Sequence, residues 1–391
     1  MKRGPTGTYD SMAVAGEVVR AFVPSPLPPV PPVVLTGRLQ LGLERAQLAL
    51  GRLDSVSTLL PGPRLFLYSY VRKEALLSSQ IEGTQSSLSD LLIYELAQAP
   101  GAPIDDVVEV ANYVAALEHG LQRLRGGFPL SGRLLREIHH RLLALGRGSS
   151  KEPGEYRRSQ NWIGGTRPGN AAFVPPPAAR VAECMGELER FLHGQSDLPV
   201  LVRAALAHVQ FETIHPFLDG NGRLGRLLVT FLLCHAGVLS EPLLYLSLWL
   251  KRERATYYRL LDVVRSEGDW EAWIEFFLEG VATTADSAVG TAKRLVQLFE
   301  DDQRRIREVG GRNLATTMQI HRELQVRPLL GIQALAKATG RTFPTISRSL
   351  GVLTAPPLGI VREVTGRARN RVFCYDAYLA ILNEGTENLA R

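Results

Sequence analysis

Residues 215–226 concentrate side chains that could perform acid–base chemistry on a phosphorylated ligand. His215 is suited to take a proton from an incoming hydroxyl, because its unperturbed pKa lies near neutrality. Asp219 carries a carboxylate of the kind that holds Mg²⁺ against phosphates. The apolar run 227–233 that follows is typical of a buried helix. The pattern therefore predicts a base, a metal ligand and the start of a helix at one place.

The predicted helix start would itself be an anion site. The Asp219–Gly222 turn would lie where free backbone N–H groups and the positive end of the helix dipole meet. Gly220 and Gly222 can adopt positive φ and let a ligand approach the backbone. Arg223 and Arg226 are three residues apart, so they share a helix face and could both reach one polyphosphate.

Two plainer interpretations compete with this one. An isolated histidine is usually structural, and the other seven of the eight histidines are interpreted in that way. Asp219–Gly222 could be an ordinary turn, since its residues all favour turns. It also starts like a calcium-binding EF-hand loop, but Arg223 and Thr230 stand where that loop needs ligands. Neither interpretation explains why the base, the carboxylate, the turn and the arginines coincide.

The stretch HPFLDGNGRLGR at 215–226 resembles the signature of the Fic family, His-x-Phe-x-Asp/Glu-Gly-Asn-Gly-Arg-x-x-Arg, at every fixed position. This family transfers AMP from ATP to a hydroxyl group of a protein. The resemblance implies that His215 is the general base and that Phe217 anchors the loop in the core. It implies Mg²⁺ on Asp219 and ATP phosphates on the turn, with Arg226 on the γ-phosphate. The implied nucleotide-binding residues are Asp219, Gly220, Asn221, Gly222, Arg223, Arg226 and Tyr257.

A second motif lies at the end of a helix predicted over 65–82, which Gly83 would terminate. Ser78-x-x-x-Glu82-Gly83 is similar to the inhibitory motif of Fic proteins. The resemblance implies that Glu82 enters the active site and pairs with Arg226, which then cannot hold the γ-phosphate. The alternative is that Glu82 is a solvated residue at a helix end.

Two further features carry the same resemblance. In residues 154–177 two short apolar stretches flank a turn-rich loop, which predicts a β-hairpin. The resemblance makes residues 160–174 a flap on which the target protein docks through backbone hydrogen bonds, although a purely structural hairpin is the alternative. Tyr257 and Tyr258 form a pair that recurs in the family with its first member near the nucleotide. A tyrosine at helical spacing is more often part of the core.

Most other segments show helical periodicity. Helices are expected over 39–53, 107–124, 134–145, 178–192, 200–212, 270–277 and 283–308, and the last of these is expected to leave the catalytic domain. The prolines at 61 and 63 should end the first helix. Residues 1–36 look extended and proline-rich, either as a flexible leader or as an arm on the domain.

The C-terminal quarter carries the whole excess of positive charge. Residues 301–391 hold 14 Lys and Arg against 8 Asp and Glu, whereas the remainder of the chain holds 31 of each. Residues 331–352 predict helix, turn and helix, and two strands around a basic turn follow. The order resembles a winged helix-turn-helix. Candidate nucleic-acid contacts are Arg348, Arg367 and Arg369, with dimerisation or protein contact as the alternative.

Composition bounds the class of protein. The 391 residues indicate two or three domains, which we place at 1–100, 101–300 and 301–391. No apolar run reaches about 18 residues, so no membrane span is expected, and the N-terminus lacks the apolar region of a secretory signal. Three distant cysteines favour reduced thiols and a cytoplasmic location.

The sequence thus predicts a mostly α fold: a Fic-type helical core with a β-hairpin flap and a C-terminal winged helix-turn-helix. The predicted function is AMP transfer from Mg-ATP to a Tyr, Ser or Thr hydroxyl of a target protein or of the chain itself, inhibited by Glu82. Related Doc kinases transfer the γ-phosphate, but they depart from the Gly-Asn-Gly turn. Removal of AMP from a modified target stays open, as does an oligomer. A transcription regulator that only senses nucleotide is less favoured, because a sensor would not need His215.

Overall fold

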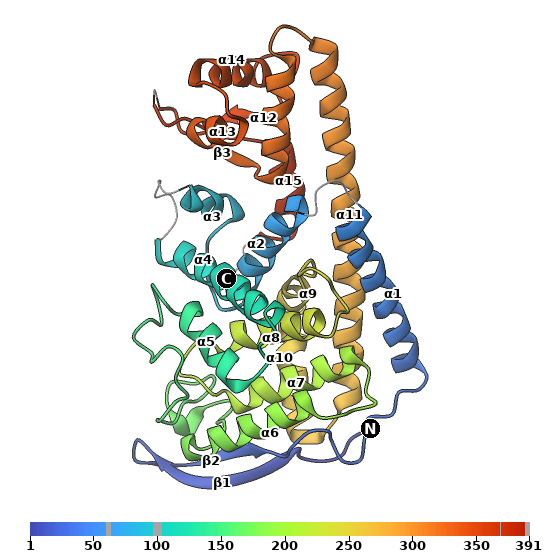
Figure 1. Cartoon of the computed structure of the whole chain (residues 1–391). Coiled ribbons are helices and arrows are strands. Elements are labelled where there is room, and N and C mark those ends of the chain that lie inside the picture. The colour runs from blue at the N-terminus through green and yellow to red at the C-terminus, as the bar shows by residue number, and fades with distance from the viewer. Residues whose placement is uncertain (60–63, 97–103, 368, 388–391) are drawn as a thin grey trace.

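The computed structural model describes residues 1–59, 64–96, 104–367 and 369–387, and it is mostly helical. The expected mostly α fold class is therefore confirmed. Figure 1 shows a helical core, a long helix along one side and a C-terminal module at the far end. Among the described residues, no helix is both long and apolar enough to cross a membrane. The predicted helix end at residues 61–63 lies outside the described part of the chain.

Helices α7 (Val200–Ile214) and α8 (Asn221–His235) form the centre of the core. Nearly every side chain of both is buried, as expected for helices that are apolar around most of their circumference. The remaining core helices are α2 (Arg64–Ile81), α3 (Leu88–Glu95), α4 (Ile104–Arg125), α5 (Gly132–Leu142), α6 (Val181–His193), α9 (Ser247–Arg252) and α10 (Arg254–Glu267). The 3₁₀ turns η1 and η2 cover Pro168–Asn170 and Ala178–Arg180.

Helices α1 (Arg38–Leu59) and α11 (Trp270–Val309) lie against each other along one side of the molecule (Figure 1). The predicted division of α11 into 270–277 and 283–308 is wrong, because α11 is one helix of 40 residues. Gly280 does not interrupt it; it leaves room for Trp249, whose ring a Cβ at this position would overlap. The helix packs on α7 and also on the C-terminal module, so it links the two parts.

The C-terminal module has the element order that the sequence predicts. Helix α13 (Ile332–Thr339) ends at Gly340, which has φ of 66°, and α14 (Phe343–Thr354) follows with a proline in its first turn. A small antiparallel sheet has the order β3-β5-β4. The other elements of the module are α12 (Leu314–Val326), β3 (Leu329–Gly331), β4 (Arg362–Glu363), β5 (Val372–Cys374) and α15 (Asp376–Asn383).

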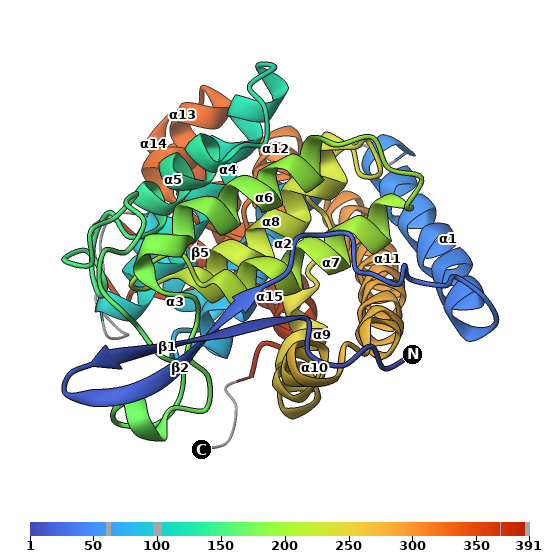
Figure 2. The ribbon, with the colours of Figure 1, turned by 90° about the horizontal axis from the view of Figure 1, so that it is seen from below.

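The N-terminal segment is an arm on the core and not a free leader. Strands β1 (Gly7–Val14) and β2 (Glu17–Pro24) form an antiparallel hairpin that crosses one face of the helical core (Figure 2). Ala15 and Gly16 both have positive φ, as a two-residue hairpin turn requires. Phe22 is fully buried and anchors the arm. The prolines at 26–32 led to the prediction of an extended segment. The hairpin of β1 and β2, which precedes these prolines, was therefore not predicted.

The predicted β-hairpin at 154–177 is much less regular than expected. Ile163 and Phe173 form an isolated antiparallel bridge, and no strand is assigned within this segment. The η1 turn lies between the two residues. On its other side this flap contacts the N-terminal arm, because the backbone N–H of Phe22 donates to the carbonyl of Val174 at 2.9 Å. Many glycines and prolines in the segment explain why no regular ladder forms.

Candidate functional site

His215 occupies a special backbone position at the end of α7. It has φ of 48° and ψ of 60°, and its N–H donates to the carbonyl of Phe211 at 2.9 Å. Its pKa is lowered to about 4, because burial disfavours the imidazolium and the charge of Arg157 adds to this effect. The ring is therefore neutral at pH 7. Within the described part of the chain its Nδ1 has no hydrogen-bond partner.

Arg157 fixes the backbone of the His215 loop, and the sequence analysis missed this role. Its Nε donates to the carbonyl of His215 at 2.9 Å and its Nη2 to the carbonyl of Pro176 at 2.5 Å. Its own N–H donates to the carbonyl of Pro216 at 2.9 Å. Burial lowers the pKa of Arg157 to about 10, so it remains a cation at pH 7. The neighbouring Arg158 is exposed, and nothing in the sequence pattern distinguishes the two.

The turn after His215 is held from several sides. Asn221 accepts from the N–H of Phe217 at 2.9 Å and donates to its carbonyl at 2.8 Å. His139 lies stacked on the Phe217 ring, with centroids 3.8 Å apart, and its Nε2 lies 2.9 Å from the carbonyl of Asp219. Phe217 is fully buried, as its anchoring role requires. Gly220 precedes α8 with φ of 75°, which favours glycine.

The first turn of α8 provides an anion site. The N–H groups of Gly222 and Arg223 have no acceptor among the described residues. Unpaired N–H groups and the helix dipole together favour a negative charge at this position. A Cβ added at Gly222 would overlap the carboxylate of Glu82. The Glu82 carboxylate therefore lies beside the anion site, against the backbone of Gly222.

Arg226 binds both ends of the predicted inhibitory motif. Its Nη2 donates to Glu82 at 2.7 Å and to the carbonyl of Ser78 at 3.0 Å, and its Nε donates to the Ser78 hydroxyl at 2.8 Å. Burial acts to raise the pKa of Glu82, but the charge of Arg226 outweighs it and the pKa is lowered. A lowered carboxyl pKa means that the contact is present at pH 7 and is lost only in acid.

Arg223 points to other partners than Arg226. It contacts Glu109 at 3.2 Å and the Asp219 carboxylate at 3.3 Å, and Glu109 also accepts from Arg147 at 2.7 Å. The two arginines therefore do not converge in this structure, although the sequence placed them on one face. Arg223 supports Asp219, and direct contact of Arg223 with a nucleotide stays a prediction.

These groups border a cavity of about 550 Å³, which is within the usual size range of small-molecule sites. Its walls include Glu82, His215, Gly222 and Arg226, the flap residues Trp162, Ile163 and Phe173, and Tyr257 and Tyr258 of α10. The Tyr257 hydroxyl lies 2.8 Å from His208 Nε2. Tyr257 thus borders the cavity, its hydroxyl is already bonded, and its contact with a nucleotide stays a prediction.

Glu212 is a second residue that the sequence analysis missed. It lines the cavity one helical turn before His215, and its Oε1 has no hydrogen-bond partner in the described structure. Burial raises its pKa to about 7, although Arg226 acts in the opposite direction. A Cβ at Gly225 would overlap this carboxylate, so the glycine makes room for it. In the sequence, only the position of Glu212 three residues before His215 could have indicated that it belongs to the site.

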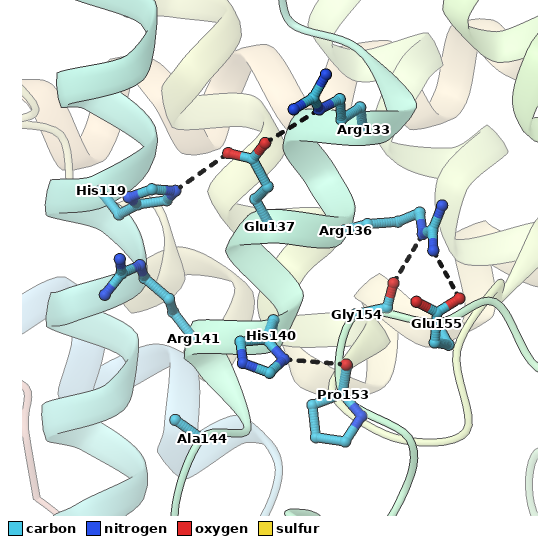
Figure 3. A pocket seen from close by; sticks show the side chains of 10 residues that line it. All are labelled: His119, Arg133, Arg136, Glu137, His140, Arg141, Ala144, Pro153, Gly154 and Glu155. Atoms are coloured by element: carbon cyan, nitrogen blue, oxygen red, sulfur yellow. Dashed lines mark hydrogen bonds and ion pairs between the residues drawn. The ribbon is translucent and has the colours of Figure 1, made fainter.

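A larger hollow of about 770 Å³ lies elsewhere, between α4, α5 and the loop before the flap (Figure 3). Its arginines are largely neutralised, because Arg133 pairs with Glu137 at 3.4 Å and Arg136 with Glu155 at 2.6 Å. Its two histidines, His119 and His140, contact Glu137 at 3.4 Å and the carbonyl of Pro153 at 3.1 Å, whereas Nδ1 of His215 has no hydrogen-bond partner among the described residues. The chemistry is therefore assigned to the smaller cavity.

Comparisons with solved structures bear on the fold. The crystal structure of a Fic family protein from Desulfovibrio desulfuricans G20 aligns with a TM-score of 0.57 at 23% identity, over 88% of this chain and 97% of that chain. A Fic domain containing signaling protein from Bacteroides thetaiotaomicron aligns with a TM-score of 0.51 at 20% identity, over 64% of this chain and 97% of that chain. At these identities the likeness concerns the fold alone.

Curated relatives and family models bear on the sequence. Protein adenylyltransferase Fic of Drosophila ananassae is 32% identical over 210 residues, which are 53% of this chain and 39% of that protein. The protein of the same name from Drosophila yakuba is 33% identical over equal shares, so the chain spans 39% of the length of these relatives. The Fic/DOC family N-terminal model matches residues 41–122, and the Fic/DOC family model matches residues 129–233. The first region contains Glu82 and the second contains all of His215–Arg226, so the chain contains a Fic/DOC N-terminal region and a Fic/DOC region at these positions.

Proposed function

We propose that the protein transfers AMP from Mg-ATP to a hydroxyl side chain of a target protein or of itself. One observation carries the proposal: a neutral His215, an unpaired helix N-terminus and the cation of Arg226 border the same cavity. A base beside an anion site is what transfer of a phosphorus group to a hydroxyl needs. The name protein adenylyltransferase, carried by the relatives, favours AMP as the group transferred.

In this proposal His215 accepts the proton of the target hydroxyl as its oxygen attacks the α-phosphorus of ATP. The bond from that phosphorus to the bridging oxygen breaks, and pyrophosphate leaves. The N–H groups of Gly222 and Arg223 bind the departing phosphates, and Arg226 holds the γ-phosphate. Phosphate binding of this kind requires that Glu82 releases Arg226.

Asp219 is the residue that would hold Mg²⁺. Its Oδ1 accepts from the N–H of Gly220 at 2.5 Å, and the side chain keeps 35% of its surface exposed, which leaves Oδ2 available. No cluster of three or more potential ligands occurs among the described residues. One carboxylate still fits, because Mg²⁺ commonly takes its other ligands from substrate phosphates and water. When bound, the ion would neutralise charge on the phosphates.

We propose that the target segment docks on one particular edge of the 160–174 flap. Ile163 and Phe173 exchange two backbone hydrogen bonds, at 2.8 and 3.1 Å. Because backbone groups alternate along an extended segment, those of Trp162 point the other way, and the extended segment ends at Gly164, which has φ of 68°. The opposite side of the flap is covered by β2 through the contact between Phe22 and Val174. The edge that carries Trp162 is therefore the one that can accept a strand.

The reaction can be identified by labelling. Protein incubated with α-labelled ATP should retain the label, and protein incubated with γ-labelled ATP should not. Retention of the γ-label would indicate a kinase instead. If neither label is retained but AMP is lost from a modified target, hydrolysis is the better assignment. Binding of ATP with no product of any kind would favour a nucleotide sensor.

Arg157→Gln is expected to lower AMP transfer by about 10²-fold, because small displacements of a catalytic group have effects of this order. Loss of the nearby positive charge should also raise the pKa of His215, so the acid limb of the pH–rate profile should move to higher pH. Arg158→Gln is the matched control and should behave as wild type. Equal rates and equal profiles for both variants would show that Arg157 does not position His215.

We propose duplex DNA as the partner of the C-terminal module, as a second candidate function. Arg348, Arg367 and Arg369 are exposed and have no ion pair in the described structure, whereas Arg362 of the same module pairs with Asp376 at 2.7 Å. Unpaired cations on a helix-turn-helix and on the turn beyond it suit phosphates beside a major groove. The exposed Phe343 at the start of α14 adds an apolar contact for a base.

The full chain should therefore shift duplex DNA in a mobility assay at low salt, and the affinity should fall steeply as salt rises. Removing Arg348 and Arg367 together, each as Arg→Ala, should weaken binding and reduce the salt slope by about two. Arg304→Ala removes an arginine that is paired with Asp301 on α11 and serves as the control. No shift, or a shift that the double variant leaves unchanged, would favour a protein partner.

A further inference from the structure

We infer that the four residues after α15, Glu384–Glu387, act as a strap that holds helix α2 in its inhibitory position. The inference rests on the proposed function, because it assigns the regulation of the same site. It means that the C-terminal module and the anion site are mechanically linked. Displacement of the strap would let α2 withdraw Glu82 from Arg226.

The strap binds α2 through its backbone carbonyls. Lys73 Nζ donates to the carbonyl of Glu384 at 2.8 Å, and Gln80 Nε2 donates to the carbonyl of Thr386 at 2.9 Å. Gly385 lies between these contacts and packs against Leu248 of the core. The residue before Gly385 and the residue after it therefore both contact α2.

A third contact joins the strap, α2 and α9. Lys251 donates from its Nζ to the Gln80 side chain at 2.7 Å and also to the carbonyl of Glu387. Lys73, Gln80 and Lys251 are each less than 5% exposed. Buried polar groups are costly when they lose their partners. The carbonyls of the strap thus accept hydrogen bonds from these three buried side chains. If the strap were displaced, water would have to replace the carbonyls as acceptors.

The strap and Arg226 contact opposite faces of α2. Ser69, Lys73 and Gln80 recur at helical spacing, and Ser69 lies 2.8 Å from the Tyr378 hydroxyl of α15. Ser78, which binds Arg226, lies roughly 160° away around the helix. The helix is therefore clamped between the C-terminal module on one face and Arg226 on the other. A shift of the first face must move the second, because a short helix moves as a rigid body.

A purely structural role for the strap would give the same contacts but no effect on Glu82. The two roles are separated by a variant that displaces the strap without changing α2 itself. Gly385 has φ of 79°, and a Cβ there would overlap Leu248, so Gly385→Val should lift the strap. Gly359→Val is the matched control, since Gly359 also has positive φ but open space around it.

The experiment measures self-labelling with α-labelled ATP in the full chain. Gly385→Val should raise labelling about fivefold or more, as expected for coupling between sites, and Gly359→Val should not. In a chain that already carries Glu82→Gly, the Gly385→Val change should add nothing, because both act on one contact. Thermal melting confirms that each variant is folded.

The outcomes separate this inference from the proposed function. If Glu82→Gly is active but Gly385→Val labels at the wild-type rate, the strap does not regulate the site. If Glu82→Gly is itself inactive, the proposed function fails. Amide hydrogen exchange then tests independently whether the strap holds α2 in place. Faster exchange of residues 78–82 in Gly385→Val than in Gly359→Val would support the link, and equal exchange would overturn it.

Discussion

His215→Ala is expected to lower AMP transfer by ~10²–10⁴-fold while ATP binding stays nearly unchanged. The ring is the base in the proposed mechanism, and its low pKa keeps it in the neutral form that can accept a proton at pH 7. The phosphates would bind at the N-terminus of α8, which contains no atom of His215. Chemistry and binding should therefore separate in this variant.

The comparison is best made in a chain that also carries Glu82→Gly, so that the starting rate is high enough to show a large loss. Initial rates with α-labelled ATP report transfer, and titration with ATP reports binding. His235→Ala provides the control, since His235 is an exposed histidine at the end of α8. Transfer at an unchanged rate without His215 would remove it from the mechanism.

Glu82→Gly is expected to raise transfer roughly ten- to a hundredfold, visible as AMP on the chain itself. The Glu82 carboxylate lies 2.7 Å from Arg226 and beside Gly222, so Glu82 and a γ-phosphate compete for the same guanidinium. Coupling between such sites is on the order of 1–3 kcal/mol, and each ~1.4 kcal/mol changes an equilibrium tenfold. Because Glu82 keeps 35% of its side chain exposed, solvent screening favours the lower part of this range.

Two further variants identify the cause of the gain. Glu82→Gln retains the shape of the side chain but removes its charge, so it should activate if the ion pair is what matters. Arg226→Ala should abolish the gain, because the same guanidinium serves the inhibitor and the γ-phosphate. If Glu82→Gly and wild type label at equal rates across ATP concentrations, Glu82 is only a residue at a helix end.

The central site could be predicted from sequence because its parts are local. His215, Asp219, Gly222 and Arg226 lie within twelve residues, and the end of α7, the turn after it and the start of α8 place them. The pairing of Glu82 with Arg226 joins distant residues, and there the family motif supplied what periodicity could not. The end of the helix before Gly83 was also a local signal, and α2 ends at Ile81 with Gly83 at φ of 98°.

The features that could not be predicted depend on tertiary contacts. Arg157 is recognised only because the Ile214–Pro216 backbone folds against it. The N-terminal hairpin owes its place to Phe22 packing beside Phe173, which no local pattern indicates. The strap binds α2 through backbone carbonyls, so no side-chain motif in the sequence indicates these contacts. Arg223 and Arg226 likewise have different partners because Arg223 pairs with Glu109, which lies more than a hundred residues away in the sequence.

Intact-mass spectrometry of the Glu82→Gly chain after incubation with Mg-ATP tests the central claim most directly. We expect a covalent increase in mass equal to one or more AMP groups, absent when His215→Ala is added and much weaker in wild type. An increase equal to phosphate, or an unchanged mass in the presence of added target proteins that also stay unmodified, would contradict it.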